Sequence, residues 1–213
     1  MEPIIEGNFY HIYNRGAGRN FLFKDDEDFS TFINKYTYYV TPAVKTYAWC
    51  LLNNHFHVLI GIRTQKEQVH FYQTHVCDFR NDKFHGKMSP EQKPFSGSRQ
   101  LNHFMNSFTR SINSKYGRSG TLIEGPLKRK KVVDRANLLH LVCYIHRNPI
   151  HHGIIEDYHQ YKFCSYLDYL SRRDSFIEKS FVLDAFGGEK KFITAHQEFR
   201  LKWSPGKDGP YFE

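Results

Sequence analysis

Two histidines separated by one residue, His55 and His57, stand in a short apolar run of this chain. In an extended strand successive side chains point to opposite faces, so both imidazoles share one face while Phe56 and Val58 take the other. Two imidazoles on one strand can hold a divalent cation and leave coordination positions for a third ligand and a substrate oxygen. A half-buried strand whose polar face happens to carry histidines is the structural alternative, because a His-x-His pair is a weak signal by itself.

A second set of reactive side chains lies on a predicted helix that runs from about Asn137 and is stopped by Pro149. Residues four apart share a helix face, so Tyr144 and Asn148 project together, with His140 one turn earlier. A phenol, an amide oxygen and an imidazole thus line one ridge. The structural alternative is a core tyrosine followed by an ordinary helix C-terminal asparagine.

Basic residues form the third group. Four consecutive cations begin a predicted strand at residues 128–133: Lys128, Arg129, Lys130 and Lys131. Such a cluster is costly unless an anion screens it, which favours contact with a DNA backbone over a solvated edge strand. Arg15, in a Gly-rich turn, is expected to point at whatever binds above the sheet, while Arg110 and Lys115 are candidates for phosphate contacts or for a solvated helix face.

Length and composition limit the class of protein. The chain has 213 residues, enough for one domain with additions, and its 16% aromatic content excludes a disordered chain. The 30 Lys and Arg against 22 Asp and Glu give a formal charge of +8, which favours a polyanionic partner, with nucleic acid the leading candidate. No apolar run approaches the roughly 18 residues of a membrane span, and no signal sequence is recognisable, so no membrane partner and a cytoplasmic location are expected. The four cysteines lack metal-type or redox-type spacing, so reduced thiols are expected.

The expected elements follow an order of strand, helix, strand, strand, then helix, strand and helix. In chain order they lie at residues 9–13, 25–39, 46–52, 55–62, 100–116, 128–133 and 137–148, with further helical segments at 163–170 and 181–199. The two strands around Asn53-Asn54 form a hairpin. Residues 64–98, with a possible helix at 67–80, are interpreted as an insertion over one edge of the sheet, and residues 203–213 as a loose tail.

Several of these motifs occur together in one known family. His55-Phe56-His57, the segment Leu127-Lys128-Arg129-Lys130, and Tyr144-Ile145-His146-Arg147-Asn148-Pro149-Ile150 resemble the single-tyrosine HUH transposases. The chain is more closely similar to their REP-associated tyrosine transposase branch, which is insertion sequence 200-like. Residues 10–16 and 104–109 add to the similarity, which spans roughly residues 8–170.

The resemblance implies an α+β fold: a ferredoxin-like antiparallel sheet with helices packed on one face, plus C-terminal helical additions. It implies a catalytic domain at residues 1–170, with 64–98 as an insertion. Residues 171–213 lie beyond the similarity and are interpreted from their own pattern as a C-terminal helical extension and tail. The resemblance further implies that Mg²⁺ or Mn²⁺ is held by His55, His57 and Asn148 and that Tyr144 is the nucleophile. His140 is the alternative third ligand. His146 is expected to point away from Tyr144, and His151 and His152 to have lost the helical register.

Carried over by these positions, the expected activity is that of a metal-dependent DNA strand transferase. It would cleave and rejoin single-stranded DNA, near hairpins of the REP type, through a 5′-phosphotyrosine intermediate, as a monomer or a homodimer. A non-catalytic module of the same fold that binds single-stranded or hairpin DNA is the main alternative. A metal-dependent hydrolase acting on RNA is a third possibility.

Overall fold

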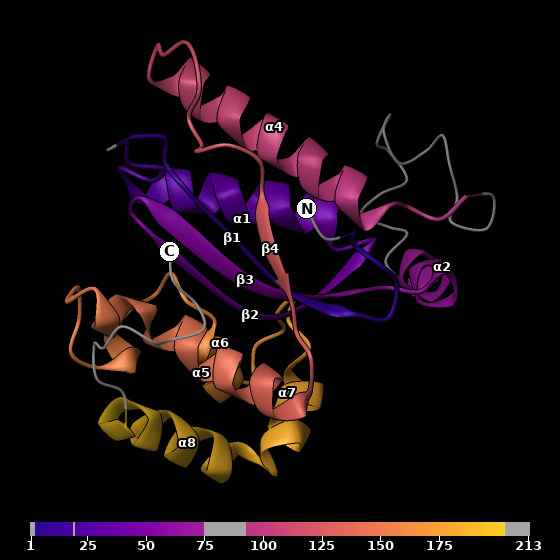
Figure 1. Cartoon of the computed structure of the whole chain (residues 1–213), viewed down its shortest axis with the longest axis vertical. Coiled ribbons are helices and arrows are strands. Elements are labelled where there is room, and N and C mark those ends of the chain that lie inside the picture. Colours follow the sequence, from indigo (N-terminus) through magenta and orange to yellow (C-terminus); the bar gives the residue numbers. More distant parts are fainter. Residues whose placement is uncertain (1–2, 19, 75–92, 203–213) are drawn as a thin grey trace.

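The computed structural model describes residues 3–18, 20–74 and 93–202 of the chain. Its elements (Figure 1) are β1 (Phe9–Arg15), α1 (Asp26–Val40), β2 (Val44–Leu52), β3 (His55–Ile62), α2 (Gln65–Thr74), α4 (Gly97–Lys115), β4 (Lys128–Lys131), α5 (Arg135–His151), η1 (Tyr158–Gln160), α6 (Tyr166–Leu170), α7 (Lys179–Phe186) and α8 (Glu189–Lys202).

The four strands form one sheet in the order β2-β3-β1-β4, and all three pairings are antiparallel. Without α2, the order of elements through β4 is βαββαβ, the ferredoxin-like arrangement. Strands β2 and β3 are joined by the two-residue turn Asn53-Asn54, where Leu52 pairs with His55. The predicted antiparallel α+β fold with C-terminal helical additions is confirmed.

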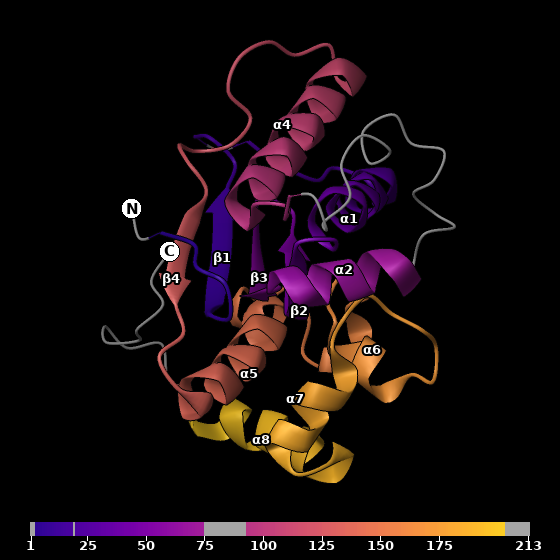
Figure 2. The same cartoon turned by 90° about the vertical axis from the view of Figure 1, so that its right-hand side faces the viewer.

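Helices cover both faces of the sheet. Figures 1 and 2 show α1 and α4 together on one face, and α5 with the later helices on the other. The predicted one-sided helical layer therefore corresponds to α1 and α4, and α5 adds a second layer. Because it is enclosed on both sides, β3 is buried at every position.

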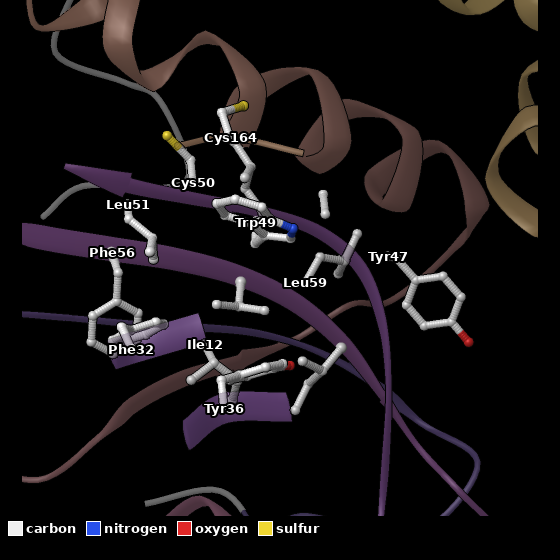
Figure 3. Close-up of a cluster of buried hydrophobic side chains, with 14 of the residues drawn as sticks. Ile12, Phe32, Tyr36, Tyr47, Trp49, Cys50, Leu51, Phe56, Leu59 and Cys164 are labelled. Atoms are coloured by element: carbon white, nitrogen blue, oxygen red, sulfur yellow. The ribbon is translucent and has the colours of Figure 1, made fainter. Parts of the chain in front are cut away.

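The core between the sheet and the first helical layer is built from aromatic rings. Phe32 of α1 is 1% exposed, and its ring centroid lies 5.1 Å from Phe56 of β3 and 4.8 Å from Phe104 of α4. Figure 3 shows Phe32 and Phe56 on one side of the strands, with Cys50 and Cys164 on the other. Burial of each such ring stabilises the fold by about 1.5–3 kcal/mol, so this layer fixes the strand that carries the two histidines.

The two helices of this layer are also tied by charge. Asp25 caps α1, accepting from the amide of Asp28 at 3.0 Å. Lys115, at the end of α4, lies 2.8 Å from Asp25 and 2.9 Å from Asp28, both at the start of α1. Lys115 was a candidate for phosphate contacts in the sequence, but the structure engages it in this acidic cluster.

Several element boundaries differ from the sequence-based prediction. The helix expected to stop at Pro149 continues through it to His151. Strand β4 ends at Lys131, two residues earlier than expected. Helix α2 is described over Gln65–Thr74, and the rest of the helix expected at 67–80 lies outside the described residues, as does the tail at 203–213. In the part of the chain that the structure describes, every helix is too short or too polar to cross a membrane.

Candidate active site

Strand β3 places His55 and His57 side by side on the face of the sheet that α5 covers. Their ring centroids are 5.2 Å apart, with ring planes at 87°. Both side chains are buried, at 6% and 2% exposure. Phe56, between them, points to the other face and packs on Phe32, as the alternation of a strand requires.

In each ring the Nδ1 atom faces a specific neighbour. His55 Nδ1 lies 2.7 Å from the side-chain oxygen of Asn54 in the hairpin turn. Since an amide oxygen accepts but cannot donate, this Nδ1 carries the hydrogen. His57 Nδ1 lies 2.9 Å from His11 Nε2 on the neighbouring strand β1. The Nε2 atoms are therefore the ring nitrogens that a cation would meet.

His11 is a site residue that the sequence analysis missed. It is 2% exposed, and its pKa is held well below the usual range, first by burial and then by the nearby His57 and Lys130. The spacing of His11 and Tyr13 on β1 repeats that of the β3 pair, and Tyr13 pairs directly with His57. Period-two alternation on two adjacent strands is the signal that would have found it.

Helix α5 brings Tyr144 to these rings. The Tyr144 ring meets His57 edge to face, with centroids 5.8 Å apart, and meets His11 in the same way at 6.2 Å. The helix begins at Asp134, whose side chain accepts from the Asn137 amide at 2.7 Å. Tyr144 is half-buried, so its phenol belongs to a site that keeps some access to solvent.

The same ridge of α5 continues past Tyr144. Because the helix runs through Pro149, Asn148 and His152 follow Tyr144 at four-residue spacing, with His152 as the C-cap. The His152 ring lies 4.7 Å from that of His55. The expectation that His151 and His152 have lost the register is therefore wrong, since His151 is the last residue of α5 and His152 is its C-cap.

Asn148 is 1% exposed and lies on this ridge between Tyr144 and His152. Its Nδ2 donates to the Tyr144 carbonyl at 3.1 Å. Within the described part of the chain, its buried Oδ1 has no hydrogen-bond partner. A buried oxygen in this state is costly, and a cation would satisfy it.

These donors suit an open divalent-cation site. In residues 3–18, 20–74 and 93–202, no group of three or more His, Cys, Asp or Glu side chains is arranged to hold a metal, and the buried Oδ1 of Asn148 is an oxygen donor that could join His55 and His57. Two imidazoles and one carboxamide oxygen leave coordination positions open for substrate oxygens, unlike the four protein ligands of a closed structural zinc site. Such an open site can take Mg²⁺ or Mn²⁺, the ions that the resemblance implies. The residues present fit the ion that the resemblance implies.

His140 and His146 lie away from this site. The His140 ring packs edge to face on Phe199 of α8 at 4.9 Å, and burial lowers the pKa of His140. His146 lies on another side of α5, as expected, where its Nδ1 is 2.8 Å from His196 Nε2 and its Nε2 is 2.8 Å from Ser165 Oγ.

The contacts of His146 form a continuous buried chain. His196 Nδ1 lies 2.8 Å from the Phe192 carbonyl, so it donates there and accepts at Nε2. His146 therefore donates to His196 from Nδ1, and Ser165 donates to His146. Ser165 in turn accepts from the Trp49 amide at 2.9 Å. The chain of bonds ties α8 and α5 to strand β2 and is structural.

Strand alternation divides the four cations of β4. Lys130 pairs with His11 and Lys128 with Tyr13, so both face the histidine side of the sheet. Lys128 lines a small cavity with Tyr13, Asn14, Arg15, His55 and His57. Arg129 and Lys131 point to the opposite face.

The other two predicted DNA-binding residues are placed differently. Arg15 pairs with Glu124, with its Nη2 at 3.3 Å from Oε1, and this pairing lowers the pKa of the Glu124 carboxyl. Arg110 is exposed on α4, on the other side of the sheet from the histidines. The structure therefore leaves Arg15 at the rim of the site and does not bring Arg110 to it.

Comparisons with known proteins add one relationship. No family model matches the sequence, and no curated protein matches it. The structure is similar to that of a REP-associated tyrosine transposase bound to a REP hairpin, with a TM-score of 0.57 and 14% sequence identity. The match covers 81% of this chain and 84% of the other. The resemblance expected from the sequence is thus confirmed as a shared fold.

Proposed function

We propose that this protein is a divalent-metal-dependent enzyme that cleaves and rejoins single-stranded DNA through a covalent tyrosine intermediate. The proposed nucleophile is Tyr144, and the proposed ligands of Mg²⁺ or Mn²⁺ are His55, His57 and Asn148. The observation that carries the proposal is the contact of the Tyr144 ring on α5 with the ring of His57 on β3, at 5.8 Å between ring centroids.

In the proposed reaction, the Tyr144 oxygen forms a bond to phosphorus as the bond from phosphorus to the 3′-oxygen breaks. The phenolic proton ends, overall, on the leaving 3′-oxygen, which gives a 5′-phosphotyrosine and a free 3′-hydroxyl. A bound divalent ion supplies charge that polarises the phosphate and favours the phenolate, which is scarce near neutral pH for a phenol of pKa about 10. Because the covalent link retains the energy of the phosphodiester, a 3′-hydroxyl can reverse the step without ATP.

The proposed function assigns a role to each segment of the chain. Residues 1–170 form the catalytic domain, with residues 64–98 as an insertion, and residues 171–213 form the C-terminal extension. Lys128 and Lys130 are proposed to contact DNA phosphates beside the site, and Arg15 to contact them at its rim. Arg129, Lys131 and Arg110 are proposed to contact phosphates of the DNA farther from the site. The proposed substrate is single-stranded DNA that carries a hairpin, in keeping with the hairpin bound to the similar protein.

The test uses two tyrosines that flank the same imidazole. Tyr13 of β1 has its ring centroid 5.9 Å from His57, nearly as close as Tyr144, but burial raises the pKa of its phenol. Labelled single-stranded hairpin oligonucleotides with Mg²⁺ or Mn²⁺ are expected to give a covalent adduct on a denaturing gel. Tyr144→Phe should abolish the adduct and Tyr13→Phe should retain it. An adduct that persists in Tyr144→Phe contradicts the assignment.

A DNA-binding module of the same fold is the second candidate. It is favoured by the hairpin bound to the similar protein and by the cations of β4. A module would retard hairpin DNA on a native gel equally well with Mg²⁺ or with a chelator, and no adduct would form across a range of hairpins. A metal-dependent hydrolase acting on RNA is the third candidate, and the denaturing gel repeated with labelled RNA oligonucleotides tests it by the appearance of cleavage products.

A further inference from the structure

The contact between His11 and His57 joins two strands on the histidine face. The register pairs Tyr13 with His57 and His11 with Leu59, so His11 and His57 are diagonal neighbours. Their rings are nearly parallel, with planes at 20° and centroids 5.1 Å apart. His11 Nε2 and His57 Nδ1 face each other at 2.9 Å in a buried environment.

Two ring nitrogens at this distance share one hydrogen, so one of them donates and the other accepts. If His57 donates from Nδ1, its Nε2 keeps a lone pair that can bind a cation. If His11 donates instead, a neutral His57 carries its hydrogen on Nε2 and cannot bind a cation there. The direction of this one hydrogen bond therefore decides whether His57 can act as a ligand.

In the neighbouring His55, the Nδ1 atom carries the hydrogen, which leaves Nε2 with its lone pair. Its Nδ1 donates to the Asn54 amide oxygen at 2.7 Å, a partner that can only accept. The Asn54 oxygen can only accept, whereas His11 can accept at Nε2 when its own hydrogen lies on Nδ1. A carboxylate in the place of His11 would also orient the ring, but it would add a negative charge close to a substrate phosphate.

We infer that His11 is a positioning residue, which accepts the Nδ1 hydrogen of His57 and so leaves Nε2 of His57 for a divalent cation. This inference rests on the proposed function, because it assigns the cation to His57. It also fixes the state of His11, whose own hydrogen then lies on Nδ1. Metal-bound histidines commonly donate their other N–H to a partner that orients the ring, and loss of that partner typically weakens metal affinity 10–100-fold.

The first test needs neither metal nor activity. Long-range ¹H–¹⁵N correlation spectra of the metal-free, ¹⁵N-histidine-labelled protein report which nitrogen of each neutral ring carries the hydrogen, with His57→Gln and His55→Gln used for assignment. We expect the Nδ1–H tautomer for both His55 and His57. A native His57 with its hydrogen on Nε2 would overturn the inference, whatever the protein catalyses.

The second test compares substitutions at His11. His11→Met removes the acceptor, and His11→Gln offers an amide oxygen in its place. Mn²⁺ binding, followed by electron paramagnetic resonance of the free ion, should weaken roughly 10–100-fold in His11→Met and recover in part in His11→Gln. His55 should keep its Nδ1–H signal in both variants, which also shows that β3 is folded.

The outcomes separate the two proposals. Native Mn²⁺ affinity together with an unchanged His57 tautomer in folded His11→Met refutes the role of His11 and leaves the proposed function standing. Absence of Mn²⁺ binding by the native protein contradicts the proposed metal site, while the tautomer of His57 still decides the hydrogen bond.

Discussion

The ring of His152 lies 4.7 Å from the ring of His55, so the end of α5 reaches the start of β3. Tyr144, eight residues earlier on the same ridge, meets His57. At 1.5 Å per residue these two contacts are about 12 Å apart along the helix, which therefore spans the whole histidine pair. Asn148 lies midway between them.

His55, His57 and His152 are expected to contribute unequally to adduct formation. His55→Ala and His57→Ala each remove a proposed ligand and should reduce adduct formation at least about 100-fold. His152 is exposed at the helix end, so His152→Ala should reduce it less than about tenfold. Rates of adduct formation on one hairpin oligonucleotide measure all three. A loss in His152→Ala as large as that in His57→Ala would contradict the ligand assignment.

Sequence patterns were sufficient for the strand that holds the site. The alternation around His55 and His57 predicted both the strand and its two faces, because a period of two is a local property. The sheet itself was expected from the family resemblance, because a local period does not specify which strands pair. His11 escaped notice because its role depends on which residues of two strands are diagonal neighbours, and that register is set by long-range pairing.

The end of α5 could not be predicted from local rules. A proline disfavours a helix because it lacks an N–H and clashes with the preceding turn. Here Pro149 is buried, and the following turn keeps its bonds, with the His152 amide donating to the Asn148 carbonyl at 3.0 Å. Tertiary packing outweighs the local preference, and His152 is thereby placed at the site.

Asn148 should show opposite effects on stability and on metal binding. Its Oδ1 is buried, with no hydrogen-bond partner among the described residues, so Asn148→Leu should leave the free energy of unfolding unchanged or raise it by about 1 kcal/mol. The same change removes the proposed oxygen ligand, so Mn²⁺ affinity should fall. Urea denaturation and Mn²⁺ titration of the metal-free protein measure the two effects. A destabilised variant with native Mn²⁺ affinity would show that Asn148 serves only the fold.

The alternation of β4 offers a charge-matched comparison. The double variants Lys128→Ala/Lys130→Ala and Arg129→Ala/Lys131→Ala each remove two positive charges, but from opposite faces. If both cations of a pair contact DNA phosphates, their removal should make the plot of log affinity against log salt concentration shallower by about 1.4. Each neutralised phosphate of single-stranded DNA contributes about 0.7 to that slope. At saturating DNA, the first variant alone should slow adduct formation, because its cations face the histidines. Equal rates of adduct formation in the two double variants would contradict a specific role for the cations on the histidine face of β4.

The buried hydrogen-bonded histidines His146 and His196 should make the free energy of unfolding depend on pH. Burial lowers the pKa of His196 to about 4 and that of His146 well below its usual value, so both are neutral in the folded protein. Above about pH 7.5 the unfolded chain is largely neutral at these positions too, and stability is full. As the pH falls below 6.5, the unfolded chain binds protons that the folded one does not. His196 alone should then lower the free energy of unfolding by about 3 kcal/mol by pH 4.

Urea denaturation between pH 7.5 and 4.5 measures this loss. His196→Gln removes one titrating group and should flatten the decline, whereas His70→Gln, at an exposed position on α2, should keep the native dependence. The comparison of slopes is informative even if His196→Gln is less stable overall, because linkage depends on protons bound and not on the absolute free energy. If the free energy of unfolding falls equally steeply with pH in the native protein and in His196→Gln, then His196 does not stay neutral in the folded state. The acid sensitivity would then arise at other groups.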